Sequence, residues 1–293
     1  MDIKDFYNNI DHLSGNRLSI LQNAMKSFTE KQAAQASAGL AYYTFFSIFP
    51  LMLVFVAVGS FFLDSQQVFS TVTQFVQQAL PISRQVINEN LREILETRGT
   101  AGVVSLLILL WAASGMFTNL AYNINLAWPR ATRRNFLQNR LVGLWMIGGL
   151  IGLIVVSLVL SWLTTRLPFI NKIADASPLD LFLLRLISAV GSWLMIFLAF
   201  LTLYRWIPTL RVPWRATLWG ALIASIAWKM VTTSFSWYLG SGFGQYQLVY
   251  GSLGAIVAFL FLIYIISLIT LFGAHLSAAI QNWESDRVQT AAT

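Results

Sequence analysis

Long apolar blocks with almost no charged residues alternate along the chain with short polar stretches. A helix that crosses a bilayer needs about 20 largely apolar residues. The blocks that meet this requirement lie at 38–63, 101–127, 141–165, 180–204, 217–239 and 251–280. The pattern therefore predicts an all-α, polytopic membrane protein with six transmembrane helices.

Two regions outside these blocks have a helical periodicity of their own. In the N-terminal tail, apolar residues recur at helical spacing from Leu18 to Phe28, which predicts an amphipathic helix. That helix either lies in the membrane interface or packs on the end of the bundle, and the pattern fits both arrangements. The first loop, 64–100, carries two further amphipathic stripes on either side of Pro81. We expect these stripes to be helices on the outer side, either as a lid over a cavity or as simple packing.

Basic residues are concentrated in segments that would lie on one side of the membrane. They occupy the N-terminal tail, the loop 128–140, the loop 205–216 and the C-terminal tail, whereas the opposite loops hold fewer. Because lysine and arginine are retained on the cytoplasmic side, both termini are predicted to be cytoplasmic. The expected division is a tail with an interfacial helix at 1–37, a six-helix domain at 38–283 and a C-terminal tail at 284–293.

The composition supports this class. The chain has 293 residues, of which 57% are hydrophobic and 11% are charged, whereas soluble domains carry about 25% charged residues. Its formal net charge of +7 would suggest nucleic acid in a soluble protein. Here the basic loops account for that charge, so the expected partner is the lipid bilayer, and no nucleic-acid partner is predicted.

One lysine, Lys229, lies about 12 residues into the fifth predicted span. A charge at the centre of a bilayer costs at least about 2.5–3.5 kcal/mol. The hydroxyl residues that share its helical face are Ser225, Thr232, Thr233 and Ser236. The interiors of the predicted spans contain no Asp or Glu that could pair with it. Two interpretations stay open: an amine in a cavity that attracts an anionic group, or a buried amine satisfied by hydroxyls and carbonyls.

Two further polar residues inside the spans are candidates for a cavity or a substrate site. Arg185 lies six residues into the fourth predicted span, where it either anchors the helix at the interface or faces a cavity. Asn125 belongs to a small, polar stripe of the second span together with Ser114 and Thr118. Such stripes allow close helix contacts, although they can also line a pathway.

Enzyme chemistry has little support in the sequence. The chain has no cysteine, so thiolate catalysis and disulfides are excluded. Its histidines, His12 and His275, lie far apart, and the acidic residues on the predicted cytoplasmic side are confined to the tails. A nuclease needs carboxylates that hold metal ions or a histidine acid–base pair. We therefore predict no catalytic residue, metal site or cofactor, and a ribonuclease is disfavoured.

Several stretches resemble the YihY / virulence factor BrkB family of bacterial inner-membrane proteins. They are "AGLAYYTFFSIFPLMLV", "WAASGMFTNLAYNINLAW", "WIPTLRVPWRATLWGA" and "YQLVYGSLGAIVAFLFLIYIISLITLFGAHLSAA". The resemblance implies a six-span protein of the inner membrane. Most members have no settled activity, and the family was once mislabelled ribonuclease BN. The resemblance supplies no catalytic residues.

The function that these observations favour is transport. Lys229 with its hydroxyl stripe, Pro50 inside the first span and the long first loop are all typical of a transporter or permease. An anionic lipid or solute is the expected substrate class. The alternative is a non-catalytic scaffold or partner protein of the cell envelope, and the sequence does not predict the oligomeric state.

Overall fold

The computed structural model describes residues 17–59, 100–166, 178–240 and 254–292, which form seven helices and no strand. In chain order the helices are α2 (Arg17–Glu30), α3 (Ala33–Gly59), α6 (Thr100–Leu126), α7 (Phe136–Arg166), α8 (Pro178–Trp206), α9 (Trp214–Gly240) and α11 (Gly254–Ala292). The predicted helices of the first loop, 64–100, lie outside the described residues apart from their last position. The all-helical class is thus confirmed for the part of the chain that is described.

Each predicted span coincides with a helix, although the helix ends differ. Among the described residues, three segments are long and apolar enough to cross a membrane, namely Leu107–Leu126, Trp214–Tyr238 and Ile256–Arg287. Val190–Trp206 is a shorter apolar helix. Helix α11 continues to Ala292, well past the apolar block.

The extension of α11 has local causes. The Ser285 hydroxyl donates to the carbonyl of Gln281 at 3.0 Å. The Arg287 guanidinium lies over the Trp283 ring at 4.1 Å from its centroid. The Arg287–Trp283 pair, four residues apart, stabilises the helix whether or not the segment is apolar, so the helix outlasts the hydrophobic pattern.

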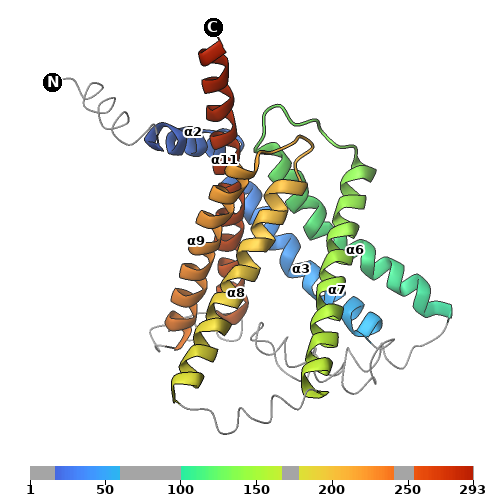
Figure 1. Cartoon of the computed structure of the whole chain (residues 1–293). Helices are drawn as coiled ribbons and strands as arrows, with labels where there is room; N and C mark the ends of the chain where they lie inside the picture. Colours follow the sequence, from blue (N-terminus) through green and yellow to red (C-terminus); the bar gives the residue numbers. More distant parts are fainter. Residues whose placement is uncertain (1–16, 60–99, 167–177, 241–253, 293) are drawn as a thin grey trace.

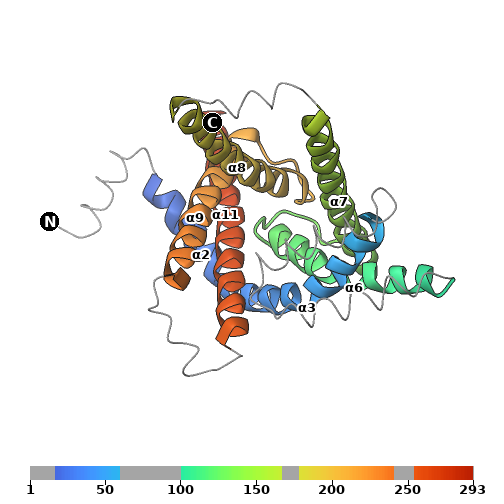
Figure 2. The ribbon, with the colours of Figure 1, turned by 90° about the horizontal axis from the view of Figure 1, so that it is seen from below.

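The helices that follow α2 form an open arc (Figure 2). Along the arc α7 packs on α6, α6 on α3, α3 on α11, α11 on α9, and α9 on α8. Helices α7 and α8 are consecutive in the chain but stand at opposite ends of the arc, without extensive packing between their described residues. Helix α2, the last turns of α11 and the loops 127–135 and 207–213 lie together at one end of the bundle (Figure 1), which we call the loop end.

The buried core lies towards the loop end, where α3, α6, α8, α9 and α11 converge. Small residues let α9 and α11 approach closely, because a Cβ atom at Gly220 would lie 2.8 Å from the carbonyl oxygen of Gly273. Next to this contact the hydroxyl of the fully buried Tyr204 donates to the carbonyl of Thr270 at 2.8 Å. The helices are thus held by backbone proximity and one buried hydrogen bond.

Helix α2 both packs on the bundle and presents an apolar edge. Its buried Ala24 contacts α11 near Leu276 and Ala279. Leu21 and Met25 remain about half exposed, at 49% and 58%. The two alternatives considered from the sequence are therefore compatible, since one edge of the helix is docked and the neighbouring edge is open.

Candidate functional site

Two side-chain amides close the loop end of the bundle, and Asn125, near the end of α6, is the first of them. Its Nδ2 donates to the carbonyl of Thr132 at 3.0 Å, and its Oδ1 accepts the backbone N–H of Thr209 at 2.9 Å. The Thr209 hydroxyl donates to the same Thr132 carbonyl at 3.1 Å. The amide therefore ties the loop 127–135 to the loop 207–213.

Gln281 on α11 is the second amide that links the two loops, and we call Asn125 and Gln281 with these contacts the amide brackets. The indole N–H of Trp128 donates to Gln281 Oε1 at 2.9 Å. Gln281 Nε2 donates to the carbonyl of Arg211 at 3.3 Å. Each amide thus uses its donor on one loop and its acceptor on the other, which satisfies both ends of a group that is costly to leave unpaired.

Arg134 adds a third link between the same loops. Its Nη2 donates to the carbonyl of Ile207 at 2.6 Å. Burial lowers the pKa of the Arg134 guanidinium from its usual value, yet arginine keeps its charge in proteins. A charged donor makes a stronger hydrogen bond than a neutral one, so this contact reinforces the two amide brackets.

An apolar layer lies directly inside the brackets. Its fully or nearly fully buried members include Leu40 of α3, Ile124 of α6, Tyr204 of α8 and Leu271 of α11. Because these side chains come from four helices and pack in one cluster, the loop end is closed by both hydrogen bonds and hydrophobic contact.

The arginine at the start of α7 is held against α6. The Arg140 guanidinium lies over the Trp111 ring, 4.1 Å from its centroid, and donates to the carbonyl of Trp111. Close beside it, a Cβ at Gly143 would lie 2.9 Å from the carbonyl of Ser114. Ser114 and Thr118 of the polar stripe of α6 therefore lie in a close helix contact.

Lys229 lies on the exposed side of α9, and no described residue pairs with its ammonium. Gly220 and Ala224 face α11. At about 100° per residue, Lys229 is about 140° around the helix from Ala224. The lysine thus points away from α11.

The hydroxyls of the predicted stripe do not converge on this amine. Ser225 is buried and donates to the carbonyl of Leu222 at 2.9 Å. Thr232 donates to its own helix at Trp228, and Ser236 donates to Thr232, both at 2.9 Å. Thr233 is exposed. The role of this stripe in a cavity stays a prediction.

The other polar residues noted in the sequence lie in different parts of the structure. Asn125 lies in the loop-end bracket, far along the chain from the stripe on α9. Arg185 belongs to α8, but its side chain is not among those described. His275 accepts or donates a hydrogen bond with the Ser27 hydroxyl at 2.9 Å, which joins α11 to α2.

The sequence analysis did not single out Gln281, Trp128 or Thr209. Their signal was weak, because each lies in a short polar stretch beside an apolar block. In the sequence, Asn125 lies at the end of one apolar block and Gln281 just beyond the last one. Amides in such positions are compatible with many different contacts. The pairing depends on contacts between residues 84 and 153 positions apart.

Comparison with known proteins gives one family. A family model described as virulence factor BrkB matches residues 24–293. A UPF0761 membrane protein of Alteromonas mediterranea is 28% identical over 282 residues, covering 95% of this chain and 92% of that protein. A UPF0761 membrane protein of Vibrio campbellii is 27% identical over 274 residues, covering 92% and 85%.

Another relative has a different kind of name. A Bacillus subtilis protein with the provisional name ribonuclease-like protein YfkH is 25% identical over 265 residues, covering 89% of this chain and 94% of that protein. No solved structure matches the chain.

Proposed function

The chain belongs to the virulence factor BrkB family of membrane proteins, and on that premise we propose that it is a transporter for an anionic lipid or solute. It crosses the bacterial inner membrane six times, with the loop end and both termini in the cytoplasm. The basic residues of the two loops support this orientation, since Arg130, Arg133 and Arg211 are exposed at the loop end.

The observation that carries the proposal is the hydrogen-bonded closure of the loop end. Asn125 and Gln281 connect α6, the loop before α7, the loop before α9, and α11. A hydrogen bond contributes about 0.5–1.5 kcal/mol net. A few such bonds stabilise a closed state by a few kcal/mol, which is the free-energy difference typical of two conformations that exchange. The brackets therefore act as a cytoplasmic gate that opens without unfolding a helix.

Lys229 supports an anionic substrate. An exposed ammonium that lies in a candidate span attracts a negatively charged group within the membrane. The hydroxyls of Ser225, Thr232 and Ser236 are occupied by their own helix, so the charge is the recognition element on this face.

The test is transport by the purified, reconstituted chain. Vesicles that contain a fluorescent phosphatidylglycerol report on lipid movement between leaflets, and vesicles loaded with an anionic dye report on solute release. Opening the gate by Asn125→Ala is expected to change the rate, whereas the Asn123→Ala control is expected to leave it unchanged. Rates equal to those of protein-free vesicles for both cargoes would reject transport.

A scaffold or partner protein is the second candidate, and one observation favours it. Lys229 is exposed, so an intramembrane carboxylate of another protein would pair with it favourably. A photoreactive residue in place of Thr233 would then form a stoichiometric crosslink to that partner in cells, whereas a transporter would form crosslinks mainly to lipid.

Catalysis is not part of the proposal. The described residues bring no three His, Asp or Glu side chains together. The ribonuclease-like name belongs to the Bacillus subtilis relative. Rigorously purified protein that cleaves RNA would overturn this view.

A further inference from the structure

The two loops that the amide brackets join carry exposed arginines beside their point of contact. The Thr209 hydroxyl donates to the Thr132 carbonyl at 3.1 Å, so the loops touch directly. Arg130 and Arg133 lie within two positions of Thr132, and Arg211 lies two positions after Thr209. All three arginines are exposed. One contact between separate loops thus places three exposed basic residues close to it.

The elements that carry these arginines contain no acidic residue. Residues 100–166 and 181–240 include both loops and the helices beside them, and no Asp or Glu occurs among them. Helix α11 does carry acids at this end, but Glu284 pairs with Arg215 at 3.5 Å and Asp286 has a contact of its own. The loops therefore present positive charge without a carboxylate of their own.

The neighbouring spans place both loops at the surface of the bilayer. The candidate span Leu107–Leu126 ends directly before the first loop, and the candidate span Trp214–Tyr238 begins directly after the second. Trp206 and Trp214 flank the second loop and are 76% and 58% exposed. Because exposed tryptophans gather at the level of lipid headgroups, the arginines between them lie where the phosphates of a leaflet lie.

Local contacts hold the loops in this arrangement. The Arg205 guanidinium lies 5.0 Å from the centroid of the Trp214 ring and donates to the Val212 carbonyl. Arg134 donates to the Ile207 carbonyl of the other loop at 2.6 Å. An anion that contacts both loops therefore meets a surface that is already ordered, which lowers the entropic cost of binding.

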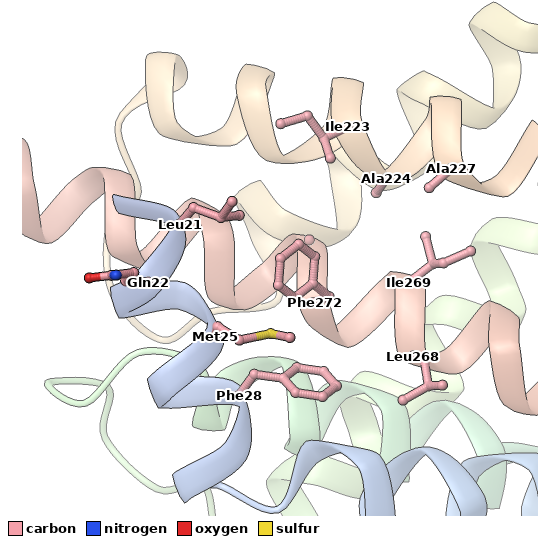
Figure 3. Close-up of a pocket in the computed structure, with 11 residues that line it drawn as sticks. Leu21, Gln22, Met25, Phe28, Ile223, Ala224, Ala227, Leu268, Ile269 and Phe272 are labelled. Carbon is pink, nitrogen blue, oxygen red and sulfur yellow. The ribbon is translucent and has the colours of Figure 1, made fainter. Parts of the chain in front are cut away.

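The apolar groove between α2, α9 and α11 has the opposite character (Figure 3). Its lining includes Met25, Phe28 and Phe272. Gln22 is the one polar residue of the lining, and it directs its amide away from the other side chains. The lining offers an anionic group no charged partner, so the groove is an internal reference for the loops.

We infer that the surface formed by the two loops binds the anionic headgroups of phospholipids in the leaflet at the loop end, through Arg130, Arg133 and Arg211. Charge selects this partner, since basic segments next to a span attract acidic lipids. A headgroup that contacts arginines of both loops stabilises their joined state, because a ligand shifts an equilibrium towards the state that it binds better. The inference does not rest on transport, since the loops of a scaffold protein would bind the same lipids.

Photocrosslinking with headgroup probes tests the binding. The full chain is reconstituted in phosphatidylcholine vesicles with a trace of phosphatidylglycerol or phosphatidylcholine that carries the same photoreactive group beside its phosphate. Adducts are mapped by mass spectrometry. On residues 128–136 and 206–214 the phosphatidylglycerol probe is expected to give about fivefold more adducts or better, since one arginine near an anionic surface contributes about that factor. On residues 268–273 of the groove the two probes are expected to label equally.

Two double variants with the same change in charge locate the preference. Arg130→Gln with Arg133→Gln is expected to lower the phosphatidylglycerol preference of both loops about fivefold or more. Lys26→Gln with Lys31→Gln removes two exposed basic residues in and just after α2, and it is expected to keep the preference. Equal losses in both variants would assign the preference to the overall charge of the protein and overturn the inference.

Hydrogen exchange tests the link between the loops. The N–H of Thr209 donates to Asn125 Oδ1 at 2.9 Å. Its exchange is expected to be about fivefold slower in vesicles rich in phosphatidylglycerol than in phosphatidylcholine vesicles. Equal rates in the wild type would mean that the headgroups do not stabilise the joined state.

Two further outcomes would overturn the inference. Equal labelling of the wild-type loops by both probes would leave an acidic protein surface as their partner. Displacement of the loop adducts by soluble glycerol phosphate would assign the surface to a soluble anion. The wild-type comparison needs no variant to fold, and it measures binding without any cargo, so it can fail while transport is still observed.

Discussion

Gly220 of α9 lies against Gly273 of α11 so closely that a Cβ atom at Gly220 would be 2.8 Å from the Gly273 carbonyl oxygen and would clash with the Ser277 hydroxyl. Real Cβ atoms essentially never approach a backbone atom so closely. The contact therefore sets the distance between α9 and α11, and α11 carries the Gln281 bracket.

Gly220→Ala is expected to lower the free energy of unfolding by about 1–3 kcal/mol, because the added methyl must push two packed backbones apart. The measurement is the thermal or denaturant midpoint of the purified protein. Gly148→Ala is the control, since nothing lies within 4 Å of the new methyl group on α7 and alanine is the better helix former. A Gly220→Ala protein as stable as the control would contradict the close contact.

The amide of Asn125 is the next site to change. Asn125→Ala leaves the N–H of Thr209 and the carbonyl of Thr132 with one partner fewer, at a cost of about 1–3 kcal/mol. We expect amide hydrogen exchange at Thr209 to accelerate about tenfold or more, because 1.4 kcal/mol corresponds to a factor of ten.

Asn123→Ala is the matched control for this change. The Asn123 amide bonds to Asn119 of its own helix, at 2.9 Å to the carbonyl and 2.6 Å to the side chain. Its loss is expected to leave the loops 127–135 and 207–213 unchanged. Similar acceleration in both variants would mean that α6 loosens as a whole and that no specific bracket exists.

The helices could be predicted because apolar blocks and helical periodicity are local properties of the chain. The amphipathic helix from Leu18 to Phe28 and the block that contains Lys229 both lie in helices of the structure. Helix α11 continues beyond the predicted span 251–280, and its polar turns hold contacts such as Arg287 on Trp283 that hydropathy does not register.

The direction in which a helical face points could not be predicted in the same way. The residues of the stripe that contains Lys229 do lie on one helix, α9. The direction in which the stripe points depends on which side of α9 contacts α11, and the Gly220–Gly273 contact determines that side. The role of Asn125 likewise depends on Thr209, 84 positions away. A single sequence carries no record of such long-range contacts.

The docking of α2 gives a further prediction. Ala24 is fully buried against α11, so Ala24→Leu is expected to undock α2, since overpacking costs about 1–3 kcal/mol. The readout is proteolysis near Gln32, whose φ of 52° makes the sharp turn between α2 and α3. Met25→Leu changes an exposed neighbour at similar volume, and it is expected to keep the wild-type cleavage rate.

The last prediction concerns the charge of Lys229. Lys229→Leu removes a group that costs at least about 2.5–3.5 kcal/mol at the centre of a bilayer, so the variant is expected to insert at least as well as the wild type. If the ammonium recruits an anionic cargo, transport of phosphatidylglycerol or of an anionic dye is lost, whereas Lys229→Arg retains most of it. The neighbouring Met230→Leu, on another exposed position, is expected to be fully active. A Lys229→Leu protein that transports normally would mean that the charge serves another purpose, and a crosslinked partner lost in the same variant would identify that purpose as protein binding.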